Sequence, residues 1–160
     1  MAQDHFLKID GIDDKSADDR HQGEIELDSC SFGGAQSATF QGGGGTRTGK
    51  FSVQEFNFTA KIRKASTRFF EACATGKHLP SATMTGRRAG RDLQEYLKIT
   101  LTNVLISSYQ QSGANGTDVP TDQVSLSYTK IQIEYREMKQ DGSFGGPVTG
   151  GFDVKASSRV

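Results

Sequence analysis

The chain has 160 residues, of which 34% are hydrophobic, 19 are glycine and only 3 are proline. This composition suits a single loop-rich, β-dominated domain over residues 1–160 better than a helical bundle or two ordinary domains. The 19 basic and 19 acidic side chains balance, so no global field attracts nucleic acid or an anionic membrane. No signal peptide and no run long enough to span a membrane is visible, which predicts a soluble protein made in the cytoplasm.

Alternating apolar and polar residues predict two strands near the start of the chain, over residues 5–10 and 23–32. In the second strand, Ile25 and Leu27 share one face. Ser29 and Ser31 continue the phase of this face, but they are small and polar. Either the strand bends there or the face passes from the core into water.

The loop between these two strands is rich in acidic side chains. Their spacing does not match a calcium-binding loop, which needs a central glycine and a terminal glutamate at fixed positions. We therefore interpret it as a solvated loop and expect neither a metal nor another cofactor, a metal site being the less favoured alternative. The residues concerned are Asp13, Asp14, Asp18, Asp19, His21 and Glu24.

Residues 42–50, GGGGTRTGK, imitate the phosphate-binding loop of nucleotide-binding proteins. Read from Gly44, they spell G-x-x-x-x-G-K, but Phe51 stands where magnesium binding needs Ser or Thr. A phosphate loop also opens a helix, whereas the residues that follow have the pattern of a strand. We therefore predict a protruding hairpin whose glycine-rich tip loses much entropy on ordering and so orders only against a partner. An ordinary surface loop is the alternative.

One helix of about three turns is predicted, with Ser66 as its N-cap and Gly76 as the residue that ends it in the left-handed conformation. Cys73 on this helix and Cys30 on the second strand lack metal-ligand spacing, which favours buried free thiols over a disulfide or a zinc site. The apolar stripe of the helix consists of Phe69, Phe70, Cys73 and Ala74.

The two longest predicted strands each change phase part-way. In residues 93–109 the apolar positions change face near Asn103, and in residues 124–135 they do so near Lys130. A shift by one residue exchanges the faces of a strand, so each change predicts a bulge or a sharp bend. If the two strands pair through a turn at residues 112–116, the bends lie opposite each other. The sheet then folds over into a barrel or an orthogonal sandwich. A last strand is predicted over residues 151–156.

No arrangement typical of catalysis is visible. His5, His21 and His78 are far apart, and no serine lies in a nucleophile-elbow setting. We therefore predict that the chain is not an enzyme. Two alternatives stay open: a hydrolase whose groups meet only in space, and a monomeric barrel that binds a small hydrophobic ligand.

Three short motifs stand close together in the middle of the chain: Gly76-Lys77-His78 with Pro80, Arg88-Ala89-Gly90, and Glu95-Tyr96-Leu97. With these motifs, residues 75–108 resemble the central signature of the haemolysin-coregulated proteins, the Hcp family, which form the tube of bacterial type VI secretion systems. Smaller matches near both ends follow in the same order, so the resemblance covers nearly the whole chain. The chain departs from the family where Phe32 and Phe152 replace a frequent Trp, and where Gly86 replaces an apolar strand residue.

The resemblance implies a two-sheet antiparallel β-barrel with one short flanking helix. It also implies homo-hexameric rings that stack head to tail into a hollow tube, which carries small effector proteins in its lumen. The tube would work with sheath and spike components and be exported itself, without a cleaved signal peptide. Ser29 and Ser31 become candidates to line the lumen and contact effectors. The glycine tip becomes a ring-stacking loop consisting of Gly42, Gly43, Gly44, Gly45, Arg47 and Lys50.

Closing a ring requires a lateral surface on each copy. Barrel-edge strands present unpaired backbone groups that a rotated neighbour can cover. Basic side chains before the helix and in the next turn are candidates to face Asp13 to Asp19 of a neighbour, with separately solvated charges as the alternative. These side chains are Lys61, Arg63, Lys64, Arg68, Arg87, Arg88 and Arg91.

Overall fold

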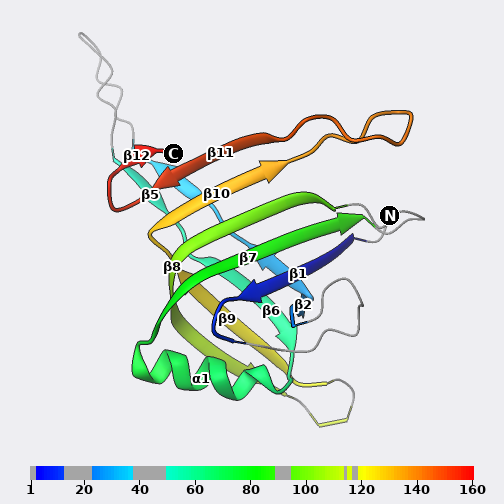
Figure 1. Ribbon diagram of the computed structural model, residues 1–160. Coiled ribbons are helices and arrows are strands. Elements are labelled where there is room, and N and C mark those ends of the chain that lie inside the picture. Colours follow the sequence, from blue (N-terminus) through cyan, green and yellow to red (C-terminus); the bar gives the residue numbers. More distant parts are fainter. Residues whose placement is uncertain (1–2, 13–22, 38–49, 89–94, 114, 117–118) are drawn as a thin grey trace.

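The computed structural model describes residues 3–12, 23–37, 50–88, 95–113, 115–116 and 119–160. Within them the chain is mainly antiparallel strand with one helix, α1 (Ala65–Thr75), as Figure 1 shows. The predicted β-dominated fold with one short helix is therefore confirmed. The strands are β1 (Gln3–Ile9), β2 (Ile25–Leu27), β3 (Ser29–Ser31), β4 (Gly34–Gln36), β5 (Phe51–Val53), β6 (Phe56–Lys61), β7 (His78–Arg88), β8 (Glu95–Ser112), β9 (Thr121–Ser127), β10 (Lys130–Tyr135), β11 (Val148–Asp153) and β12 (Ser158–Arg159).

The strand pairings form a closed circuit. The first part of β8 pairs with β7, and its last part pairs with β9. From β7 the circuit continues through β1 to β2, and from β9 it continues through β6 to β3. Only Asp28 separates β2 from β3, and its N–H donates to the carbonyl oxygen of Thr59 at 2.8 Å. The long strand β8 and the β2–β3 segment thus each pass from one sheet to the other, as expected of a barrel with two corners.

The last three strands extend the first sheet outside this circuit. β10 pairs with the first part of β8, β11 pairs with β10, and β12 pairs with β11. The last long strand covers Val148–Asp153 rather than the predicted 151–156, because the β-branched residues Val148 and Thr149 begin it. In Figure 1 the C-terminus lies close to β5 and β11.

Both predicted bends are present. Asn103 has a positive φ of 54° within β8, a left-handed conformation that Asn tolerates better than most residues. The partner strand is interrupted at Tyr128 and Thr129, between β9 and β10. Leu105 pairs with Ser127 on one side of the bend, and Thr102 pairs with Lys130 on the other. The two bends therefore lie opposite each other, and the hairpin turns the corner as one unit.

The helix packs on the barrel through a different stripe from the one predicted. Phe69 is fully buried and meets Phe58 of β6 edge to face at 5.9 Å between ring centroids. Phe70 is 63% exposed and Ala74 is also exposed, so half of the predicted stripe was wrong. The contact follows the line Ala65–Phe69–Ala72 instead, because i, i+4 and i+7 positions share one helix face. The buried residues of α1 are Ala65, Ser66, Phe69 and Ala72.

The ends of the helix differ in how well the sequence predicted them. Gly76 ends α1 in the left-handed conformation at φ 64°, as predicted. The N-cap is Lys64 rather than Ser66, which lies inside the first turn. The Ser66 hydroxyl accepts a hydrogen bond from the Arg63 N–H at 3.0 Å and donates to Asp122. Ser66 therefore bonds to the buried Asp122 of the barrel and does not cap the helix.

Candidate functional site

The outward side chains of β3, β6, β9 and the last part of β8 form one continuous surface, which we call the polar face. The strand registers place its eight polar residues in two rows that cross all four strands. Between them along each strand lie inward residues such as Phe58 and Val124, because alternate residues point to opposite faces. The first row is Ser29, Thr59, Gln123 and Gln110, and the second is Ser31, Asn57, Ser125 and Ser108.

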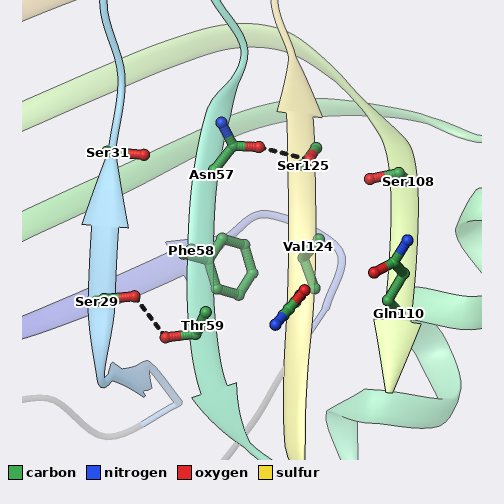
Figure 2. A pocket seen from close by; sticks show the side chains of 10 residues that line it. Ser29, Ser31, Asn57, Phe58, Thr59, Ser108, Gln110, Val124 and Ser125 are labelled. Carbon is green, nitrogen blue, oxygen red and sulfur yellow. Dashed lines mark hydrogen bonds between the residues drawn. The ribbon is translucent and has the colours of Figure 1, made fainter. Parts of the chain in front are cut away.

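Neighbouring strands are joined by side-chain hydrogen bonds across this face. The hydroxyl oxygens of Ser29 and Thr59 lie 2.5 Å apart, and the Ser125 hydroxyl donates to Asn57 Oδ1 at 2.5 Å. Figure 2 shows both bonds, with Ser31 and Gln110 on the outer strands. Half of the polar face is thus occupied by mutually bonded side chains.

The eight side chains line a shallow hollow of about 400 Å³. All are uncharged, and on the outward side of the layer charged residues stand at the two ends of the hollow. At one end the Ser127 hydroxyl donates to Glu55 Oε1 at 3.2 Å, and at the other Lys61 lies 3.8 Å from the Asp28 carboxylate. Hydroxyls and amides without an adjacent base suit weak, adaptable hydrogen bonding rather than nucleophilic chemistry.

Both serines singled out from the sequence lie on this face and are exposed. The strand bends after Leu27, so the buried phase of Ile25 and Leu27 becomes an exposed phase at Ser29 and Ser31. The other six residues were missed. Their alternation with buried residues was readable on β6 and β9, but only the register between strands shows that they form rows.

The glycine tip falls mostly outside the described residues, including Gly42, Gly43, Gly44, Gly45 and Arg47. Lys50 is exposed immediately before β5, which pairs with β4 as the base of a hairpin. Phe51 fixes that base: its ring fills the space beside Gly34 and meets Phe152 of β11 edge to face at 4.8 Å. A Cβ at Gly34 would overlap this ring, so a larger residue there would force Phe51 to move.

Arg87 was wrongly predicted to face a neighbouring copy. It is 4% exposed, its Nη2 lies 3.1 Å from Asp4 Oδ2, and its guanidinium lies 4.9 Å from the centre of the Phe6 ring. Asp4 and Arg87 stand directly opposite each other on β1 and β7, which explains the pairing. The acidic loop proposed as its partner, Asp13 to Asp19, and Arg91 lie outside the described residues.

A buried carboxylate lies beneath the polar face. Asp122 of β9 is fully buried, accepts a hydrogen bond from the Tyr109 hydroxyl at 2.7 Å, and accepts another from Ser66 of α1. Removal of Tyr109 from water, and then the bond to Asp122, raise the pKa of Tyr109 to about 12. This group could not be predicted from the sequence, because Asp122 falls in the phase of the apolar Val124 and Leu126. It ties the helix to the layer that carries the polar face.

The two cysteines are free and half-buried on β3 and α1, and burial raises the pKa of Cys30. The described part of the chain contains no group of three or more His, Cys, Asp or Glu residues placed to hold a metal. Within the same residues, no helix has the length and apolar character needed to cross a membrane.

The fold and the site define a small corner-turning β-barrel with an uncharged polar surface on one layer. Residues 6–135 match the family model described as "Type VI secretion system effector, Hcp". The chain is 41% identical to protein hcp1 of Pseudomonas aeruginosa over 157 residues, and this alignment covers 97% of each chain. It therefore belongs to the Hcp family, and the predicted resemblance is confirmed.

Solved structures agree with this assignment. The chain superposes on Hcp1 from Salmonella typhimurium with a TM-score of 0.83 at 38% identity, covering 100% of each chain. It superposes on a structure described as a type six secretion system protein with a TM-score of 0.94 at 27% identity, covering 99% of this chain and 100% of the other. The chain is thus a secreted structural component of a type VI secretion system.

Proposed function

We propose that six copies of this chain close into a ring, that rings stack head to tail into a hollow tube, and that the polar face lines the channel. The observation that carries this proposal is the pair of uncharged rows across one four-stranded layer. A channel wall that accepts different proteins in transit needs many weak contacts and no strong charge or apolar patch. The polar face has that character.

The edges of the same layer support closure of the ring. Among the described residues, β3 pairs only with β6, and residues 107–112 of β8 pair only with β9. Each edge leaves backbone groups available for another strand. Because the four strands alternate in direction, the β8 edge of one copy runs antiparallel to the β3 edge of the next. Rotated copies can therefore continue one antiparallel sheet around the ring.

Stacking is assigned to the hairpin that begins at β4 and ends at β5. In this proposal its tip, Gly42 to Gly45 with Arg47 and Lys50, reaches the adjoining ring. A head-to-tail contact does not close on itself and so propagates a filament. The aromatic packing of Phe51 on Gly34 and Phe152 supports the base from which the tip extends.

We also propose that the chain has no catalytic activity. The polar face offers hydroxyls bonded to one another or to an amide, with no histidine, lysine or carboxylate among its eight residues. Its partners would be further copies of the chain, effector proteins in the channel, and the sheath and spike of the secretion machine. It would be made in the cytoplasm and exported by that machine without a cleaved signal peptide, with no nucleic acid bound and no insertion into a membrane.

Electron microscopy of the purified protein tests the assembly. We expect six-fold rings with an open channel, and end-to-end stacks of these rings at high concentration. Reversing the charge at Arg47, with the substitution Arg47→Glu, should leave single rings intact and shorten the stacks. Arg136→Glu, directly after β10, serves as the charge-matched control. Particles without a central channel would contradict the ring, and stacks of normal length from Arg47→Glu would contradict the role of the tip.

A further inference from the structure

An aromatic pair, formed by the exposed Phe70 and the half-buried Tyr109, lies beside the open edge of β8. Phe70 of α1 is 63% exposed, and its ring meets that of Tyr109 edge to face at 6.1 Å between centroids. Tyr109 belongs to the last part of β8, which pairs with β9 on one side only among the described residues. Figure 1 shows α1 alongside this end of the barrel.

Tyr109 is held in place by two hydrogen bonds before any partner arrives. The Tyr109 hydroxyl donates to the buried Asp122 at 2.7 Å and accepts from Gln111 Nε2 at 3.2 Å. Phe70 projects from a helix whose adjoining face is anchored by the buried Phe69. Rigid aromatic side chains that lose little entropy on binding are typical anchors of protein interfaces.

The two sides of the helix differ in charge. The side next to β8 carries Thr67, Phe70, Cys73 and Ala74, and the adjoining strand edge from Ser107 to Ser112 is also uncharged. The other side carries Arg68 and Glu71, which line a separate hollow together with Lys77. Depletion of charge around exposed aromatics is the composition of an interface core rather than of a solvated helix face.

The opposite edge of the same layer has matching properties. β3 is also open on one side among the described residues, and the segment from Ser29 to Phe32 is uncharged. Phe32 is 39% exposed and stacks on the buried Phe56 at 6.3 Å. The chain therefore carries two open, uncharged edges, each with one exposed phenylalanine, and their strands run in opposite directions. A second copy of the chain presents the complement of each edge.

We propose that Phe70 and Tyr109 anchor the lateral contact, packing against the β3 edge of a second copy at residues 29–32. This inference rests on the ring proposed above and adds the side chains that hold it together. The open backbone edges supply direction and register, and the aromatic pair supplies the apolar area that excludes water from them.

The absence of tryptophan from the chain provides a direct test. In Phe70→Trp the introduced indole is the only one in the chain, so its fluorescence reports on that position alone. As the protein concentration is raised and rings form, burial of the indole should shift its emission to shorter wavelength. Glu71→Trp, on the charged side of the same helix, should keep the emission of an exposed indole over the same range. An unchanged emission maximum for Phe70→Trp at concentrations where light scattering shows hexamers would overturn the anchor and leave the ring standing.

A second variant measures the strength of the contact. Phe70→Asp should raise the concentration needed for half-assembly by about 30-fold or more, the usual effect of losing an interface anchor. Glu71→Ala should change it by less than about 3-fold, as expected for a near-neutral position. Circular dichroism should show both variants folded, since neither side chain is in the core. Hexamers of Phe70→Asp at the wild-type concentration would overturn the anchor, and a wild-type protein that stays monomeric would overturn both the ring and the anchor.

Discussion

The two faces of the β3–β6–β9–β8 layer are built from alternate residues of the same strands, yet they follow different physical rules. The inward face carries Phe56, Phe58, Val124 and Leu126, all 2% exposed or less. The outward face carries the two rows of hydroxyls and amides between them. Inward residues must fill a close-packed volume, whereas outward residues only have to remain compatible with a strand. The inward face therefore determines the fold and leaves the outward face available for function.

The largest effect is expected on the inward side of β6. Phe58→Ala removes a fully enclosed ring that meets both Phe56 and Phe69, so it should cost about 3 to 5 kcal/mol of unfolding free energy. Urea unfolding followed by circular dichroism measures this directly. Asn57→Ala, the outward neighbour, is the control and should change the free energy far less. Equal effects at the two positions would contradict the division between the faces.

The next effect concerns the buried carboxylate. Asp122→Ala leaves the hydroxyls of Ser66 and Tyr109 without their acceptor, which should cost about 1 to 3 kcal/mol. The matched control is Gln123→Ala, one residue further along β9 on the polar face. Thermal unfolding should show a clear loss of Tm for the first variant and little change for the second. A similar Tm for both would show that Asp122 is not a structural link.

High pH should destabilise the protein through the Tyr109 hydroxyl, which donates a hydrogen bond to Asp122. Since the pKa of Tyr109 is raised to about 12, the folded protein holds the hydroxyl proton more tightly than the unfolded chain. The stability from this proton is fully present below about pH 10, the ordinary tyrosine pKa, and is lost as the pH rises towards 12. Unfolding measured between pH 9 and 12 should show a smaller loss in Tyr109→Phe. An identical pH dependence in the variant would contradict this assignment.

The smallest effect on stability is expected on the outward side of β3. Ser31→Tyr should change the unfolding free energy by less than about 0.5 kcal/mol, because Ser31 is exposed. The bulky side chain should nevertheless disturb effector retention by assembled rings, measured by co-purification of a co-expressed effector. Lys98→Tyr, at an exposed position in the first part of β8, is the control for added bulk. Unchanged effector retention in Ser31→Tyr would exclude this residue from the contact.

The fold was predictable where a single strand carried the signal. The change of phase at Asn103 and the break before Lys130 were readable, because a corner must move the apolar residues of each strand from one face to the other. Gly76 was readable for a similar reason, since a left-handed helix end favours glycine. These features depend on residues close together in the chain.

The rest depended on contacts between distant segments. The polar rows require the register of four strands, and Arg87 is buried because Asp4 lies opposite it on β1. Ser66 was misplaced as an N-cap because its acceptor, Asp122, lies 56 residues further along the chain. Phe70 was assigned to the core because its spacing alone does not distinguish an apolar residue that packs on the barrel from one that is exposed.

The native mass of the purified protein, measured by light scattering or native mass spectrometry over a range of concentrations, tests the central claim most directly. If the polar face lines a channel, the protein should form a species of about six times the 17.3 kDa chain mass, with multiples of that mass as rings stack. A strict monomer at every concentration would contradict the ring and leave the polar face as an ordinary solvated surface.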